Sequence, residues 1–204
     1  MKKIIIMGVV LMVQFAFSAP LFLDNGSFEE PTIPEGSTDI GNPSLPGWSV
    51  TGSTFYAIFK GEAGGFPPVD GTQELYLLGG TLQQDLGVIE ADKTYTLTFS
   101  AGLNTGNTAI YSEVVFIDLN TGGRLAAINL GDVIVGDTPS QWFEGSLVYN
   151  SNTYAGSIGN NIAVQVNSGT QLHLDNFAIS TVPEPATVAL LGIGGLIASR
   201  RRRR

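Results

Sequence analysis

Alternation of side-chain type is strictest in one segment, Lys93-Thr94-Tyr95-Thr96-Leu97-Thr98-Phe99-Ser100-Ala101. Its apolar members, Tyr95, Leu97, Phe99 and Ala101, share one parity, and its hydroxyl-bearing members share the other. Residues of one parity lie on one face of a β-strand. The segment is therefore predicted to be a strand with one face in the core and the other toward solvent.

Eight further segments have the same short, apolar or alternating character. They are 53–60, 73–78, 81–86, 112–119, 124–130, 141–149, 161–167 and 171–180. Clusters of Gly, Pro, Asn and Asp separate them, and no long window between them has helical periodicity. This many short antiparallel strands in one domain predicts an all-β antiparallel sandwich, most simply a jelly roll.

The N-terminus has the composition of a targeting segment. The basic start Met1-Lys2-Lys3 is followed by the apolar run 4–17, and small residues occupy positions 16 and 18. This order predicts a signal helix that signal peptidase removes after Ser18.

Three unlike elements end the chain. The polar segment Val182, Pro183, Glu184, Pro185 precedes an uncharged run at 186–199, and the chain closes on Arg200, Arg201, Arg202, Arg203 and Arg204. Two prolines prevent a helix or a central strand from passing through 182–185. As a helix the run is roughly 21 Å long, against a hydrocarbon core of about 30 Å. The arginines stay cytoplasmic, so the tail is predicted to be a short apolar helix that holds the precursor transiently in the inner membrane.

This tail resembles the PEP-CTERM sorting signal of Gram-negative bacteria. The resemblance implies cleavage by an exosortase-type membrane protease and delivery to the cell surface or an exopolysaccharide matrix. An ordinary single-pass C-terminal anchor is the alternative. The expected organisation is a signal peptide at 1–18, a β-sandwich domain at 19–181 and a sorting tail at 182–204.

Charge and cysteine content limit what the central domain binds. Between residues 19 and 181 it has three basic residues against 17 acidic ones, a net charge of −14. Binding to nucleic acid is not expected, because three scattered cations make no basic patch. The chain has no cysteine, so neither disulfides nor thiolate metal sites contribute to stability.

Five short motifs resemble those of galactose-binding-like domains, the jelly-roll architecture of many carbohydrate-binding modules. They are Asn25-Gly26-Ser27-Phe28-Glu29, Pro46-Gly47-Trp48, Asp70-Gly71, Leu82-Gln83-Gln84 leading into Lys93-Thr94-Tyr95-Thr96-Leu97, and Leu172-His173-Leu174-Asp175-Asn176-Phe177. The likeness implies the fold but no particular ligand.

Parity changes within the last of these motifs. Leu172 and Leu174 share one parity, whereas Phe177 and Ile179 share the other, which predicts a β-bulge near Asp175. In the modules that the chain resembles, an acidic residue at this place and a glutamate of the N-terminal motif hold a structural calcium ion. The matching residues are Glu29 and Asp175, and carboxylate oxygens suit Ca²⁺. The alternative is a solvated Glu29 and an Asp175 that caps a turn.

The sequence favours binding or structure over catalysis. His173 is the only histidine and is expected at the surface or at a seam, and no nucleophile or zinc motif is present. A glycoside hydrolase is a remote alternative, since no carboxylate pair stands out. The main expectation is a structural or interaction role in an exopolysaccharide matrix, with a carbohydrate-binding module as the alternative. Sugar binding needs exposed aromatic rings; the chosen candidates are Phe66, Tyr154 and Trp142.

Overall fold

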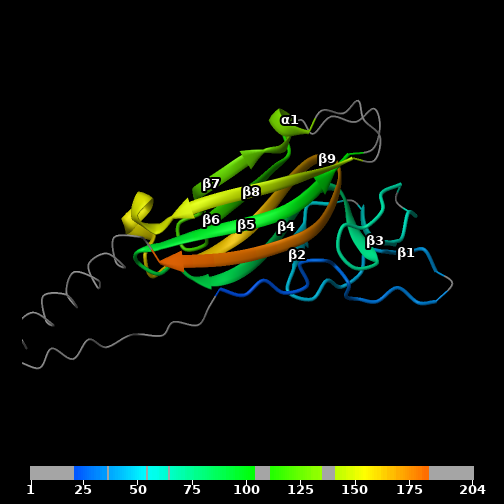
Figure 1. Cartoon of the computed structure of the whole chain (residues 1–204), viewed down its shortest axis with the longest axis horizontal. Helices are drawn as coiled ribbons and strands as arrows, with labels where there is room; N and C mark the ends of the chain where they lie inside the picture. Colours follow the sequence, from blue (N-terminus) through cyan, green and yellow to red (C-terminus); the bar gives the residue numbers. More distant parts are fainter. Residues whose placement is uncertain are drawn as a thin grey trace, which may run out of the picture.

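The computed structural model describes residues 21–183, except 36, 54, 64, 104–110 and 135–140. The signal peptide at 1–18 and the part of the tail from Glu184 to Arg204 lie outside the described residues. The elements, in chain order, are β1 (Asp39–Gly41), β2 (Ser49–Thr51), β3 (Phe55–Lys60), β4 (Gln73–Val88), β5 (Lys93–Gly102), β6 (Glu113–Asp118), β7 (Gly123–Asn129), the one-turn helix α1 (Leu130–Val133), β8 (Trp142–Asn150), the 3₁₀ segment η1 (Ser151–Ser157) and β9 (Asn161–Pro183) (Figure 1).

The predicted strands are all present, but two pairs of them are continuous. The predicted segments 73–78 and 81–86 form the single strand β4, and 161–167 and 171–180 form β9. Gly79 and Gly80 were expected to make a turn. They have φ angles of +65° and +84°, which let β4 bend without losing its neighbours. The short strands β1 and β2 were not predicted.

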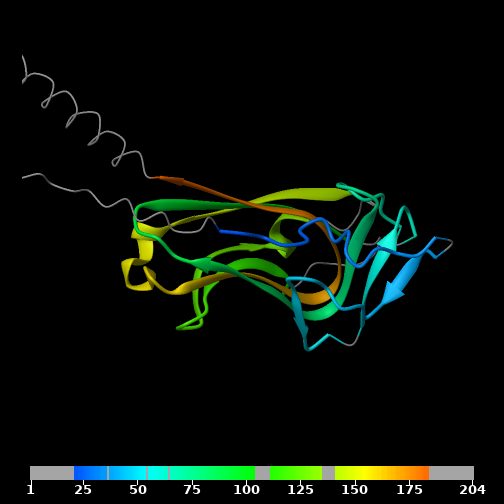
Figure 2. The same ribbon diagram turned by 90° about the horizontal axis from the view of Figure 1, so that it is seen from below.

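Bending of these two long strands produces the sandwich. The first half of β4 pairs with β3 and with β9 near Leu174, whereas its second half pairs with β2 and with β9 between Asn161 and Ser168. One layer therefore has the order β1-β3-β4-β9-β5-β8. The other contains β2, β4, β9, β6 and β7. Figure 2 shows the two layers facing each other. This is the antiparallel jelly-roll sandwich expected from the sequence.

Alternation along the strands fills the space between the layers. Tyr95, Leu97, Phe99 and Ala101 of β5 are all buried, as predicted. The N-terminal motif supplies Phe28, whose ring lies 5.5 Å from that of Trp48 and 6.0 Å from that of Phe177, measured between centroids. Aromatic contacts of this kind add to the area that they bury. Motifs distant in sequence thus meet in one core.

The bulge predicted near Asp175 is present. The register between β5 and β9 shifts between the pairs Thr98–Ala178 and Ser100–Asp175, and Asn176 has a φ angle of +54°. The shift turns both Leu174 and Phe177 into the core. It also leaves Asp175 on the opposite face of the layer, next to His173.

The sequence from Asp118 to Gly122 forms the β6–β7 turn, in which Gly122 N donates a hydrogen bond to Asp118 O. Asp118 Oδ1 accepts hydrogen bonds from the backbone N–H groups of Asn120 and Thr121, at 2.9 and 3.2 Å. Asp118 Oδ2 accepts one from Asn160 Nδ2 at 2.8 Å. These donors hold the pKa of Asp118 at about 2 although burial opposes them. The carboxylate is a charged turn cap.

Strand β9 continues into the sorting motif as far as Pro183. Beyond the bulge it pairs only with β5, and Pro183 lies opposite Lys93. Proline is tolerated there because an edge strand leaves one side of its backbone unpaired. Among the described residues there is no helix long and apolar enough to cross a membrane. The predicted apolar helix at 186–199 lies outside those residues.

Candidate functional site

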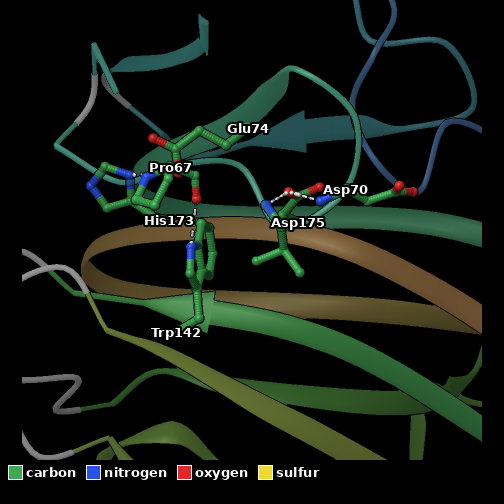
Figure 3. Close-up of polar contacts among 7 residues, drawn as sticks. Pro67, Asp70, Glu74, Trp142, His173 and Asp175 are labelled. Carbon is green, nitrogen blue, oxygen red and sulfur yellow. Dashed lines mark hydrogen bonds and ion pairs between the residues drawn. The ribbon is translucent and has the colours of Figure 1, made fainter. Parts of the chain in front are cut away.

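Three titratable side chains gather on the face of the first layer that points away from the core: Glu74 of β4 and His173 and Asp175 of β9 (Figure 3). We call them the buried acid cluster, because each is 0% exposed. His173 Nδ1 lies 3.1 Å from Glu74 Oε2. Burial raises the pKa of Glu74, and its contact with His173 opposes that rise.

The segment between β3 and β4 covers this cluster. The Phe66 ring stacks on the His173 imidazole, with 4.2 Å between centroids, and touches the Trp142 ring edgewise at 5.1 Å. Trp142 Nε1 donates a hydrogen bond of 2.8 Å to the carbonyl oxygen of Pro67. Gly102 leaves the room that Phe66 needs, since a Cβ at that position would lie 2.4 Å from Phe66 Cε1. Solvent is therefore kept away from the cluster.

Asp175 fixes one side of the covering segment. Its Oδ2 accepts hydrogen bonds from the backbone N–H groups of Val69 and Asp70, at 2.7 and 3.0 Å, and its Oδ1 accepts one from Asn176 N at 2.7 Å. Burial raises the pKa of Asp175 to about 7, and these three N–H donors offset part of the effect. A carboxyl group with this pKa exchanges its proton near neutral pH.

Glu29 fixes the other side of the same segment. Its Oε1 accepts hydrogen bonds from the backbone N–H groups of Thr72 and Gln73, at 2.7 and 2.8 Å, and its Oε2 accepts one from Thr72 Oγ1 at 3.0 Å. Gly71, with a φ angle of +72°, is required there because a Cβ would lie 2.3 Å from Glu29 Oε1. Glu29 and Asp175 thus hold five consecutive residues, 69–73, between them.

The two residues predicted to hold calcium therefore contact the same segment. Their oxygens, however, receive N–H and O–H donors, which occupy lone pairs that a cation needs. Among the described residues no three His, Cys, Asp or Glu side chains form a group suited to a metal ion. Calcium at Glu29 and Asp175 stays a prediction.

Two atoms of the buried acid cluster have no hydrogen-bond partner, Glu74 Oε1 and His173 Nε2. An unsatisfied buried polar group costs about 1–3 kcal/mol. Burial of Glu74 and His173 therefore lowers the unfolding free energy of the domain. His173 does not lie at the surface, one of its two expected places; it lies between the first layer and the covering segment. The Gly- and Pro-rich covering segment, which sequence alone does not place, closes over it.

A second polar group of residues lies at the end of the sandwich that carries α1; Figure 1 shows the position of this helix. It lines an open hollow with a volume of about 650 Å³, which we call the Tyr111 hollow; its lining residues are Tyr111, Ser112, Glu113, Arg124, Asn129, Gly131 and Asp132. Tyr111 is 88% exposed. The hollow thus combines an open aromatic ring with carboxylate, amide and guanidinium groups.

Neighbouring contacts hold most of these polar groups in place. Glu113 forms an ion pair with Arg124 and also accepts a hydrogen bond of 2.9 Å from Asn167 Nδ2. Asn129 Oδ1 caps α1 by accepting a hydrogen bond from Gly131 N at 2.9 Å. Asp132, in the only turn of α1, is exposed, and no hydrogen bond or ion pair of its carboxylate is found within the described part of the chain.

The three aromatic residues predicted to contact sugar do not form one site. Phe66, expected to be exposed, is 0% exposed, and that expectation is wrong because its ring fills the space over Gly102. Trp142, half-buried, packs against it. Tyr154 is 50% exposed but lies on η1, beyond the other end of β8. Tyr111 was not chosen from the sequence, although it follows a Gly-, Asn- and Thr-rich stretch at 102–109.

Fold and sites together define an all-β jelly-roll domain with a sealed acid cluster on one face and an open polar hollow at one end. The chain belongs to the HpiC1-like family, described as HpiC1 cyclase, whose profile matches residues 19–180. The PEP-CTERM protein-sorting motif matches residues 181–204. The sorting signal inferred from 182–204 is therefore confirmed, and the protein is a substrate for export. No curated protein sequence matches the chain.

Two solved cyclase structures agree with the fold. A cyclase from Fischerella sp. in its apo form is similar at 16% identity and a TM-score of 0.65, covering 81% of this chain and 97% of its own. A cyclase from Fischerella sp. TAU in complex with 4-(1H-indol-3-yl)butan-2-one has 16% identity and a TM-score of 0.64, with 82% of this chain and 99% of its own covered. TmCBM61, in complex with β-1,4-galactotriose, has 15% identity and a TM-score of 0.47, with 79% and 99% covered.

Proposed function

We propose that the mature domain is a non-catalytic, glycan-binding protein of the cell surface or exopolysaccharide matrix, and that the Tyr111 hollow is its binding site. Its processing partners are signal peptidase, which acts at the N-terminus, and an exosortase-type protease, which acts at the sorting motif. The observation that carries the proposal is the Tyr111 ring, 88% exposed beside fixed polar groups.

Sugar recognition needs the two kinds of surface that this hollow offers. An aromatic face covers the apolar face of a pyranose ring, while planar polar side chains bind its hydroxyl groups. Tyr111 supplies the first, and Glu113, Arg124 and Asn129 supply the second. The volume of about 650 Å³ falls in the usual range for small-ligand sites, about 300–1,000 Å³. It accommodates a few sugar units rather than a polymer buried along its length.

The test compares two exposed tyrosines at different places. The exported protein is measured by isothermal titration calorimetry against a panel of matrix oligosaccharides, and the recovered sugars are examined for cleavage. Loss of one aromatic contact of about 0.5–1.5 kcal/mol predicts that Tyr111→Ala binds about 2- to 13-fold more weakly. Tyr154→Ala is expected to bind like the parent, and the sugar is expected to be recovered intact. Absence of binding to every sugar, or a loss caused by Tyr154→Ala alone, would contradict the proposal.

A cyclisation reaction is the second candidate, and the buried acid cluster favours it. Glu74, His173 and Asp175 bring acid and base groups together, and the family takes its description from a cyclase. Against it stands the Phe66 ring, which leaves a substrate no way to His173 unless the covering segment moves. The compound in the Fischerella sp. TAU complex, 4-(1H-indol-3-yl)butan-2-one, is the probe. Its binding is followed by NMR, through shifts of the resonances of the single histidine. If Phe66→Ala binds this compound more tightly than the parent does, catalysis is favoured over the proposed function.

A further inference from the structure

We infer that the Tyr111 hollow takes a cationic glycan, a polymer of amino sugars with free amino groups. This inference rests on the proposed function and names the class of its ligand. It begins from the charges that line the hollow. Arg124, its one basic lining residue, is neutralised by the ion pair with Glu113, whereas the exposed Asp132 carboxylate has no counter-charge among the described residues.

The remaining charges of the domain also favour a cationic ligand over an anionic one. Three basic residues stand against 17 acidic ones between residues 19 and 181. Of the other two basic residues, Lys93 is paired with Glu90 and Lys60 ends β3, and neither lines the hollow. A polymer of uronic acids or sulfated sugars would therefore meet like charge both in the hollow and over the whole domain. That class of glycan is disfavoured.

A neutral glycan would use only part of the site. It would stack on Tyr111 and bind Asn129 and Glu113, but it would leave the Asp132 carboxylate without a charged partner. A sugar with a free ammonium group adds a charge-assisted hydrogen bond to that carboxylate. The negatively charged domain would also attract such a polymer from a distance. Salt screens this attraction, and the Debye length is about 10 Å at 0.1 M. Both effects select amino sugars with free amines over their N-acetylated forms.

The experiment measures the exported protein against glucosamine and N-acetylglucosamine oligomers of equal length, with oligogalacturonate as the anionic sugar, by calorimetry at mildly acidic pH. Asp132→Asn is expected to weaken glucosamine binding about twofold to fivefold, the range for an exposed ion pair, and to weaken N-acetylglucosamine binding by a smaller factor. Glu62→Gln is the matched control: it removes one exposed carboxylate in the turn after β3, outside the hollow. High salt is expected to remove the preference for glucosamine.

Each other result has a definite meaning. Equal losses from Asp132→Asn and Glu62→Gln would overturn the inference, because only the total charge of the domain would then matter. Equal or tighter binding of N-acetylglucosamine, or of oligogalacturonate, would also overturn it while leaving the Tyr111 hollow as a glycan site. If no sugar binds and Tyr111→Ala changes nothing, the proposed function itself fails.

Discussion

Replacing Asp175 by asparagine tests the raised pKa of this buried carboxyl group. The side chain is 0% exposed and accepts three backbone hydrogen bonds, and burial raises its pKa from 3.8 to about 7. The other titratable groups beside Asp175 are Asp70, Glu74 and His173, and the charge of Asp70 raises the pKa of Asp175 further. Asparagine keeps the shape of the side chain and removes the charge.

The sign of the effect follows from the two pKa values. The folded state holds its proton more tightly than the unfolded chain, so the contribution of Asp175 to stability is fully present below pH 3.8 and is lost as the pH rises through about 7. The difference between the two values corresponds to about 4 kcal/mol of unfolding free energy. Between those pH values the unfolding free energy of the parent is expected to fall by up to this amount relative to that of Asp175→Asn.

Urea unfolding followed by tryptophan fluorescence, repeated across this pH range, measures the difference. General self-repulsion in a domain of net charge −14 also lowers stability as the pH rises, so the parent curve alone does not suffice. Glu62→Gln, which removes an exposed carboxylate, is the control for that background. A constant difference between parent and Asp175→Asn at every pH would refute the reasoning. It would mean that the three N–H donors outweigh burial and keep the carboxylate charged.

Three further predictions concern the covering segment, the metal and the tail. Gly102→Ala is expected to lose about 1–3 kcal/mol of unfolding free energy through overpacking against Phe66 and to open His173 to diethyl pyrocarbonate. Equal behaviour of Gly102→Ala and Gly156→Ala, where a Cβ meets open space, would contradict this. Chelation is expected to lower the melting temperature by several degrees and millimolar Ca²⁺ to restore it, since a ligand at a hundredfold its Kd adds about 2.7 kcal/mol to the unfolding free energy. The control is NaCl at equal ionic strength. If chelator and Ca²⁺ give the same melting curves as this control, there is no structural calcium ion. Replacing Pro183-Glu184-Pro185 by alanines is expected to leave an uncleaved precursor with a folded domain in the inner membrane, and normal processing and delivery would disprove it.

Local periodicity was enough to predict most strands and even the bulge. The parity change between Leu174 and Phe177 is a short-range signal, because both side chains must enter the same core. Continuity of β4 through Gly79 and Gly80 is not such a signal. A glycine pair permits either a turn or a bend, and the choice depends on pairing with β9, which lies far away in the sequence.

The sites were harder to predict for the same physical reason. Burial of His173 depends on Phe66, which lies more than a hundred positions earlier, and on the missing side chain at Gly102. The resemblance pairs Glu29 with Asp175, and in the structure both carboxylates contact the segment before β4. Their partners, however, are the backbone N–H groups of residues 69, 70, 72 and 73, and a backbone donor leaves no mark in a sequence.

The topology also separates the proposed binding site from the point where the sorting motif begins. Strand β9 reaches Pro183 beside Lys93, at the start of β5, which is the end of the sandwich that carries η1. The Tyr111 hollow lies at the opposite end, where Glu113 at the start of β6 pairs with Asn129 and Asn167; Figure 1 shows α1, which follows Asn129, at that end. Strands β5 and β8 run the length of the layer between them, and nine residues of β8 span about 30 Å. We therefore expect a ligand in the hollow to stay clear of a protease that acts near Pro183, so that the proposed glycan binding and the processing step do not compete for space.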